Sequence, residues 1–297
     1  MNFNDLKIFK AVTVHNSFTR AAETMFTVQS NVTARIKILE KELGTELFKR
    51  NTRKTELTKS GQILMNYTSQ ILHLLEEARR EISNSDEISG TLRLGCIETT
   101  IALEIPQILK DFSNRQPFVD IEFKSALTPT LINDVLSYNL DAAFVSSPVN
   151  IPELQQQVIK EEQLAVILPG NSVSLPSILK NKIPLKIIVF DHGCVFRTRL
   201  ESWLNSKGII QFKAIVVNSI EGIINFVEAG LGISILPVEI INLYYSQRSV
   251  KTLSLNKELA TLTTILIYRN DALQSKALNA FVQDYKELPA KGINTNR

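Results

Sequence analysis

The sequence predicts an α/β protein in three parts: an all-α amino-terminal head, a long linker helix and a two-lobed α/β body. The length of 297 residues exceeds what one compact core usually holds, which indicates more than one domain. The first 89 residues contain two glycines and no proline, a composition typical of helices. After Ser89 and Gly90, short β-rich runs alternate with helical segments. We therefore expect the head at residues 1–58, the linker helix at 59–88 and the body at 89–297.

The head contains three stretches with apolar residues at helical spacing, which predict three short helices. Ser17 and Thr19 precede the second stretch and Thr27 precedes the third, and hydroxyl side chains are favoured at the start of a helix. Gly44 is suited to end the third helix in a left-handed conformation. The apolar stripe of this third helix consists of Val28, Val32, Ile36, Leu39 and Leu43. A basic loop follows, so the pattern predicts a winged helix-turn-helix.

Positive charge is concentrated in the head. Residues 1–60 hold 11 Lys and Arg against 6 Asp and Glu, whereas residues 61–297 hold 22 against 24. The basic loop suits contacts to phosphates or to a minor groove, and it contains Lys49, Arg50, Arg53 and Lys54. The third helix has a second face whose side chains suit base edges in a major groove: Gln29, Ser30, Thr33, Ala34 and Lys37, with Asn31 beside them. These patterns favour a DNA-binding head over a merely solvated helical domain with a charged loop.

Several short motifs follow one another at fixed spacing between residues 17 and 61, namely SFT-x-AA, Q-S-x-V-T, LG-x-x-LF-x-R and LT-x-x-G. They resemble the signature of LysR-type transcriptional regulators. The resemblance implies base contacts from Gln29, Ser30, Asn31 and Thr33. It implies wing contacts from Arg50, Arg53 and Lys54, and contacts to the DNA backbone from Ser17, Thr19 and Arg20. The sequence departs from the family at Met25 and Phe26, where a leucine and a smaller residue are usual, and at Ala34, so we predict no operator sequence.

The linker helix is predicted from about Thr58 to Ser85 by an apolar stripe suited to pairing with another helix. The stripe consists of Ile63, Tyr67, Ile71, Leu74, Ala78 and Ile82. The resemblance implies a homodimer or a homotetramer, with a DNA-reading head on each protomer.

Strands and helices alternate along the body, which predicts a mainly parallel sheet covered on both faces; the run LAVILP predicts one strand at 164–169. We expect one lobe from 91–161 plus 266–290 and the other from 163–265, arranged as in periplasmic binding proteins. Ligands bind such folds in the crevice where strand ends meet helix starts. At these junctions we expect effector contacts from Thr99, Thr100, Thr128, Ser146, Cys194 and Arg197. Taken singly, each hydroxyl is also a plain helix cap, and the resemblance to the LysR-type family implies the effector role.

The chemistry of the effector is left open by three residues. Arg197 suits a carboxylate or a similar anion, which predicts an anionic effector. An ion pair between Arg197 and Glu201, one turn later, is an equal alternative. Glu98 is at odds with a purely anionic ligand, because it suits either Arg197 or an amino group of the ligand.

The only two cysteines, Cys96 and Cys194, argue against a disulfide framework. A thiol at the start of a helix is often reactive, so a regulator that senses redox state or a metal through this pair is an alternative function. The competing interpretation is that both are small buried residues.

Other classes of protein fit the sequence less well. A solute-binding module predicts an export signal and no basic head, and an enzyme needs a nucleophile–base pair or a metal cluster. No apolar run reaches the ~18–20 residues of a membrane span, and the amino-terminal segment with Asp5 does not look like a signal peptide. His15, His73 and His192 lie in three different parts, which predicts no metal site. We expect a cytoplasmic regulator without catalytic residues or cofactor, whose partners are double-stranded DNA, a small-molecule effector and RNA polymerase, with no membrane partner.

Overall fold

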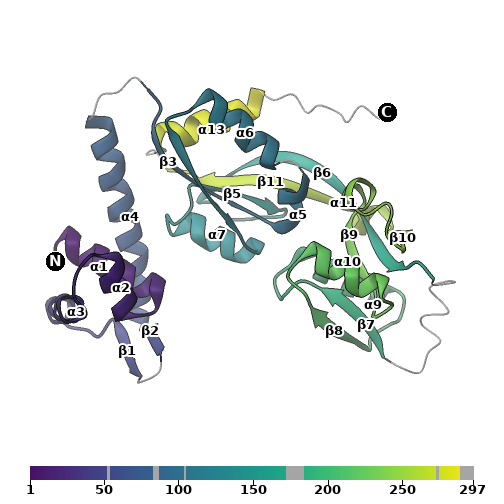
Figure 1. The fold of residues 1–297 in the computed structure, drawn as a ribbon, viewed down its shortest axis with the longest axis horizontal. Coiled ribbons are helices and arrows are strands. Elements are labelled where there is room, and N and C mark those ends of the chain that lie inside the picture. Colours follow the sequence, from purple (N-terminus) through teal and green to yellow (C-terminus); the bar gives the residue numbers. More distant parts are fainter. Residues whose placement is uncertain (52–53, 83–86, 104, 172–183, 272–273, 288–297) are drawn as a thin grey trace. The chain divides into compact units, whose positions relative to one another are not determined.

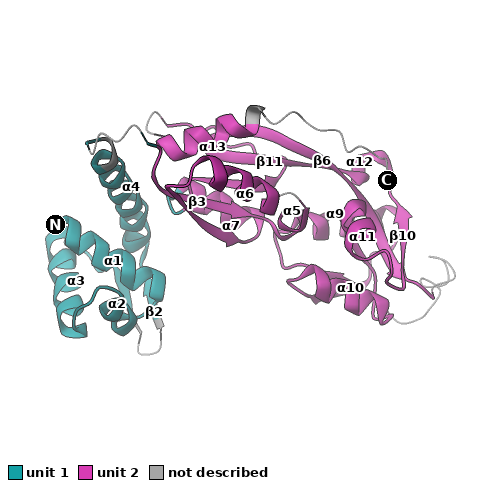
Figure 2. Ribbon diagram, turned by 45° about the horizontal axis from the view of Figure 1, so that its top comes forward, with its two compact units in different colours: residues 1–87, 137–139 teal, residues 88–136, 140–297 magenta. Residues whose placement is uncertain are grey.

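The computed structural model describes residues 1–51, 54–82, 87–103, 105–171, 184–271 and 274–287. The chain divides into two compact units (Figure 2). Unit 1 comprises residues 1–87 and 137–139, and unit 2 comprises residues 88–136 and 140–297. Among the helices described, none combines the length and the apolar character that crossing a membrane requires.

Unit 1 begins with three helices and a hairpin, which form the predicted winged helix-turn-helix (Figure 1). The elements are α1 (Phe3–His15), α2 (Phe18–Thr24), α3 (Gln29–Leu43), β1 (Phe48–Asn51) and β2 (Lys54–Leu57). The two strands are antiparallel, with Phe48 opposite Leu57. One shared core holds the helices together, and its buried side chains are Ile8, Phe9, Val12, Ala21, Ala22, Val32, Ile36, Leu39, Leu47 and Phe48.

The ends of α2 and α3 confirm two predicted caps and correct a third. Ser17 Oγ accepts a hydrogen bond from the Arg20 N–H (3.3 Å), and Gly44 ends α3 with φ of 65°. The prediction that Thr27 caps α3 was wrong, because the cap position is Val28, whose side chain accepts no hydrogen bond. Thr27 Oγ1 instead accepts from the Asn31 Nδ2–H (2.9 Å), one turn into the helix.

Helix α4 (Lys59–Ile82) begins against the backbone of Leu47. The Thr58 N–H donates to the Leu47 carbonyl (2.9 Å), and Thr58 Oγ1 accepts from the Gly61 N–H (3.0 Å). A Cβ atom on Gly61 would lie 2.2 Å from the Leu47 carbonyl oxygen, so only glycine fits there. This packing gives a physical reason for the LT-x-x-G motif, since Leu57 also borders Gly61.

Much of the apolar stripe predicted for α4 is exposed. Ile63, Tyr67, Leu74 and Ile82 are 61%, 59%, 41% and 81% exposed, respectively. Exposed apolar side chains that recur along one helix are typical of helices that pair with another helix.

Unit 2 consists of strands and helices that alternate along most of its length. Its first elements are β3 (Gly90–Cys96), α5 (Glu98–Leu103), α6 (Ile105–Arg115), β4 (Val119–Ser125), α7 (Thr128–Leu136), β5 (Ala142–Ser146), β6 (Leu154–Pro169) and β7 (Leu185–Val189). Its later elements are α9 (Val195–Ser206), β8 (Phe212–Val216), α10 (Ile220–Glu228), β9 (Ser234–Pro237), α11 (Val238–Tyr244), β10 (Val250–Ser254), α12 (Lys257–Ala260), β11 (Thr261–Arg269) and α13 (Lys276–Glu287).

The prediction of a mainly parallel sheet was wrong. Strand β3 pairs parallel with β4 and β5, and β7 pairs parallel with β8. The two long strands β6 and β11 are antiparallel to each other, and they add antiparallel pairs with β5, β9 and β10. The larger sheet has the strand order β10-β6-β11-β5-β3-β4, and β9 also pairs with β6.

Helices cover both faces of the β3–β5–β11 part of the sheet. Helices α6 and α13 pack on one face and α7 packs on the other (Figure 1). Alternate residues of β5 belong to different cores, with Phe144 facing α6 and α13 and Val145 facing α7. A further core lies around β7, β9, α9 and α10 and includes Trp203, the single tryptophan of the chain.

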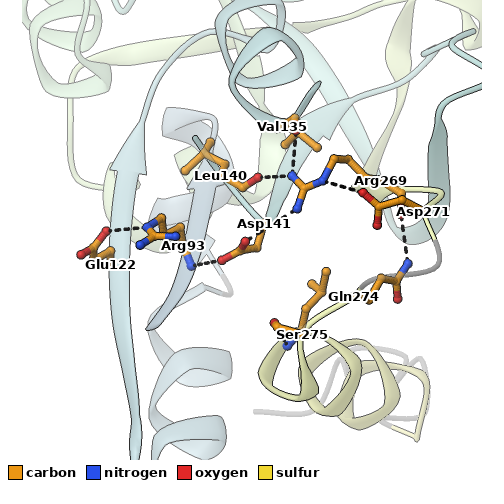
Figure 3. Close-up of polar contacts among 10 residues, drawn as sticks. Arg93, Glu122, Val135, Leu140, Asp141, Arg269, Asp271, Gln274 and Ser275 are labelled. Atoms are coloured by element: carbon orange, nitrogen blue, oxygen red, sulfur yellow. Dashed lines mark hydrogen bonds and ion pairs between the residues drawn. The ribbon is translucent and has the colours of Figure 1, made fainter. Parts of the chain in front are cut away.

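A buried arginine holds the end of β11 to the end of α7 (Figure 3). Arg269 is 5% exposed, and its Nη1–H groups donate to the carbonyls of Val135 (2.8 Å) and Leu140 (2.7 Å). Its Nη2 lies 3.8 Å from Asp141 Oδ1, and Asp141 Oδ2 accepts from the Arg93 N–H (2.7 Å). Several hydrogen bonds therefore satisfy this buried charge.

We expect Gly61→Ala to destabilise unit 1 by about 1–3 kcal/mol, because the added methyl group meets the Leu47 carbonyl. Hydrogen exchange of peptides from residues 3–48, measured in increasing denaturant, reports this loss. Gln62→Ala at the neighbouring exposed position is the control and should change the free energy of unfolding by less than ~0.5 kcal/mol. Equal exchange in the two variants would contradict the packing role of Gly61.

Candidate functional site

The predicted base-contacting residues lie on the outer face of α3. Gln29, Ser30 and Asn31 are exposed and Thr33 is half-buried. A shallow hollow of about 510 Å³ on this face is lined by Gln29, Ser30, Thr33, Ala34 and Lys37. Amide, hydroxyl, methyl and ammonium groups together can meet every kind of base edge that a major groove presents.

Hydrogen bonds within unit 1 orient several of these side chains. Thr19 Oγ1 donates to Gln29 Oε1 (3.1 Å), so the exposed Gln29 side chain is held through its amide oxygen and not through its amide N–H groups. The Asn31 amide is engaged with Thr27, and Thr33 Oγ1 donates to the Gln29 carbonyl (2.9 Å). The first turn of α3 therefore presents a preset donor at Gln29 and the exposed hydroxyl of Ser30.

Arg35, on the flank of the same helix, has a structural partner. Its Nη1 lies 3.4 Å from Oδ1 of Asp5, which is 3% exposed. Asp5 Oδ2 also accepts from the Asn2 N–H (3.1 Å) at the start of α1. The pair fixes α3 against α1 and thereby sets the position of the base-reading face.

The wing is described only in part. Lys49 and Glu56 face each other across the hairpin and form an ion pair (3.1 Å). Arg50 and Lys54 lie in β1 and β2, and Arg53 lies outside the described residues. Wing contacts to DNA therefore stay a prediction.

The exposure and the backbone conformation of Phe26 were not predicted from the sequence. Its side chain is 98% exposed and its φ is 50°, a left-handed value that bulky residues rarely adopt. It lies in the turn between α2 and α3, three residues before Gln29. The only signal in the sequence was the departure from the family pattern at this position.

A pocket in unit 2 lies where three helices begin: α5, α7 and α9. Its volume is about 20 Å³, roughly the space of a single water molecule. Of the six residues predicted to bind an effector, it brings together Thr99, Thr128, Ser146 and Cys194. The complete lining is Ile97, Glu98, Thr99, Leu127, Thr128, Ser146, Phe190, Cys194, Val195 and Phe196.

Two hydroxyl groups in the pocket have no hydrogen-bond partner among the described residues. Thr99 and Ser146 are 1% and 4% exposed, and their Oγ atoms are both buried and unpaired. Thr128 Oγ1 accepts from the Ser146 N–H (3.4 Å), and Glu98 Oε2 accepts from Ser125 Oγ (3.4 Å). Burying an unpaired hydroxyl costs about 1–3 kcal/mol, a cost that a bound polar ligand removes.

Two of the predicted effector residues do not line the pocket. Arg197 Nε donates to Glu201 Oε1 (2.9 Å), which is the ion pair that the sequence offered as an alternative. Its Nη1 is buried and has no partner among the described residues. Thr100 is buried, and its hydroxyl has no hydrogen-bond partner among the described residues.

Both cysteines are free and buried. Burial raises the pKa of the Cys96 thiol far above its usual range. Burial also raises the pKa of Cys194, against the lowering effect of the Arg197 and Phe196 backbone N–H groups and of the Arg197 charge. Cys194 lines the pocket, whereas Cys96 does not.

Metal binding has no counterpart in the part of the chain that the structure describes, where no three His, Cys, Asp or Glu residues are grouped so that they could hold an ion.

The apolar lining of the pocket was missed in the sequence. Phe190 and Phe196 contribute to it, yet both also belong to a hydrophobic core. An apolar side chain next to a cavity carries the same sequence pattern as one in a core, so periodicity gives no signal for it.

Comparisons with known proteins cover both units. Residues 3–62 match the family "Bacterial regulatory helix-turn-helix protein, lysR family", and residues 85–289 match the "LysR substrate binding domain". The uncharacterised HTH-type transcriptional regulator YusT of Bacillus subtilis is 37% identical and covers 96% of this chain and 95% of its own. The HTH-type transcriptional regulator GltR of the same species is 35% identical and covers 97% of each chain.

Solved structures show the same fold. A full-length OxyR variant from Pseudomonas aeruginosa has a TM-score of 0.70 at 18% identity and covers 97% of this chain and 95% of its own. Full-length CbnR in complex with its target DNA has a TM-score of 0.66 at 20% identity and covers 96% and 99%. YusT and GltR are both HTH-type transcriptional regulators. The chain therefore belongs to the LysR family of bacterial helix-turn-helix transcriptional regulators.

Proposed function

We propose that this LysR-family regulator reads operator DNA through the first turn of α3, and that a small molecule in the pocket of unit 2 changes its response. The observation that carries the proposal is the exposed pair Gln29 and Ser30, of which Gln29 is held in place by Thr19. A glutamine amide oriented before binding loses little rotational freedom when it meets an adenine edge. Full-length CbnR, which shares this fold, forms a complex with its target DNA, and this supports the same role here.

Contacts to the DNA backbone complete the proposed interface. Ser17, Thr19 and Arg20 lie at the start of α2, where Thr19 contacts Gln29 of α3. Arg50, Arg53 and Lys54 are the proposed contacts of the wing, and Asn31 and Thr33 are further proposed base contacts. Cationic residues that touch phosphates supply affinity, whereas residues on α3 supply sequence preference.

A homodimer or homotetramer is the proposed assembly, supported by the exposed stripe of α4. Ile63, Tyr67, Leu74 and Ile82 would be covered by the same helix of another protomer. Two heads on one assembly suit an operator with two half-sites. RNA polymerase is the further proposed partner, and the cytoplasm, where the chromosome lies, is the proposed location.

The proposed parts are the head at 1–58, the linker helix at 59–88 and the body at 89–297. Within the body, separate cores support a division into lobes at 91–161 plus 266–290 and at 163–265. Closing the lobes around an effector would change the spacing of the two heads and thereby the affinity for the operator.

A redox or metal response through Cys96 and Cys194 is the less favoured alternative. Thiolates are the reactive form of cysteine, and burial raises the pKa of both thiols. The effector pocket is favoured because Thr99 and Ser146 present buried hydroxyls that lack partners among the described residues.

We expect Gln29→Ala to weaken binding to the specific operator about 10- to 100-fold, the worth of one good base contact. Binding to unrelated DNA should change less than threefold or so, because phosphate contacts remain. Gel-shift titrations with both DNAs measure the two affinities, and Gln62→Ala on α4 is the matched control. Equal losses on both DNAs would contradict base reading by Gln29.

We expect Thr128→Trp to abolish the effector response while operator binding persists, because Thr128 is a half-buried lining residue and a tryptophan ring there would fill the pocket. Operator affinity is measured with and without a low-molecular-mass filtrate of cell extract. Thr130→Trp, at an exposed position of the same helix, is the control and should respond like the unmodified protein. A response that survives in Thr128→Trp would place the effector elsewhere.

A further inference from the structure

The starts of α7 and α9 both border the pocket, at Thr128 and at Cys194 and Val195. Helix starts carry N–H groups without partners in the helix and a partial positive charge, so they favour a carboxylate. Cys194 precedes the first residue of α9, and its side chain forms no capping hydrogen bond to the first N–H groups of the helix.

Buried hydroxyls give an independent sign of a polar ligand at the same place. The Oγ atoms of Thr99 and Ser146 are buried and without partners among the described residues, and both residues line the pocket. Hydroxyl groups donate readily to carboxylate oxygens. Together with the helix starts, these hydroxyl groups form a binding site for a carboxylate.

The pocket is also lined by a carboxylic acid, Glu98, which would repel a ligand that carries only negative charge. Glu98 lines the wall next to Thr99, and none of the described lining residues is Lys or Arg. A carboxylate ligand beside Glu98 would be repelled unless it also carried a positive charge. An α-amino acid has its ammonium group and its carboxylate on one carbon atom, which matches the adjacency of Glu98 and Thr99.

The rest of the lining is apolar, namely Ile97, Leu127, Phe190, Val195 and Phe196. We infer that the effector is an α-amino acid with an apolar side chain: its carboxylate meets Thr99, Ser146 and the helix starts, and its ammonium group meets Glu98. The inference rests on the proposed function, because it names the ligand class of the same pocket. With about 20 Å³ of space, the pocket must widen to admit such a ligand.

The test uses L-leucine, L-valine, L-methionine and L-phenylalanine, each measured by calorimetry on the full chain. Two analogues of leucine serve as probes of its charged groups: 4-methylpentanoate lacks the ammonium group and 3-methylbutylamine lacks the carboxylate. We expect at least one of the amino acids to bind and, for leucine, both analogues to bind at least ten times more weakly. Equal affinity of 4-methylpentanoate and leucine, or no binding by any of the four amino acids, would overturn the inference.

Variants test the proposed carboxylate site and the proposed ammonium site separately. Glu98→Gln should weaken amino-acid binding at least tenfold and strengthen binding of 4-methylpentanoate, whereas Glu258→Gln at an exposed position should change neither. Thr99→Val should weaken binding and raise the thermal unfolding temperature reported by Trp203, because it removes an unpaired buried hydroxyl. Unchanged amino-acid affinity in Glu98→Gln would overturn the assignment of Glu98 as the residue that binds the ammonium group.

Operator binding distinguishes this inference from the proposed function. If the low-molecular-mass filtrate shifts operator affinity while the four amino acids neither bind nor shift it, the proposed function holds and the ligand class is wrong. If neither the filtrate nor the amino acids shift it, the effector role of the pocket fails as well.

Discussion

Strands β6 and β11 run antiparallel through unit 2, with Thr261 opposite Gln163 at one end and Arg269 opposite Leu154 at the other. Leu262 belongs to the core around α9 and α10, whereas Leu266 belongs to the core beneath α6 and α13. The pairing shifts register between Thr264 and Ile265, and such irregularities bend a strand locally. Both groups of helices are therefore anchored to one pair of strands, which changes direction between them.

The pocket is connected to this pair of strands. The Ser147 N–H donates to the Thr263 carbonyl (2.8 Å), next to Ser146 of the lining and to the register shift. Farther along β11, Arg269 fixes the end of α7, the helix that begins with Thr128. A ligand that moves α7 or Ser146 therefore acts on the strands that both groups of helices share. That connection gives the proposed effector response a physical route within unit 2.

How much the sequence could predict depends on whether a residue has a local role. The helices of the head, the Ser17 cap and the Gly44 end follow from neighbouring residues, and the structure confirms them. The direction of β6 and β11 depends on pairing between distant segments, so alternation along the chain suggested a parallel sheet. The first part of β6, from Leu154, is rich in Gln, Lys and Glu, so it gave no strand signal before Leu164.

The candidate sites show the same division. Hydroxyls at helix starts are visible in the sequence, and the structure brings Thr99, Thr128 and Ser146 into one pocket. The spacing of residues along the sequence could not show whether Arg197 pairs with an effector or with Glu201, and the structure shows the ion pair with Glu201. The exposure of the Phe26 ring and the close approach of Gly61 to Leu47 depend on how the chain is arranged in three dimensions, which the spacing of residue types along the sequence does not give.

Chemical protection of guanine N7 by the full-length protein on its operator tests whether α3 reads DNA in the major groove. We expect protection of guanines in two half-sites on one face of the duplex, separated by a whole number of helical turns, because each head places one α3 in a major groove. Protection that is confined to phosphates or to the minor groove, with every guanine N7 still reactive, would contradict it.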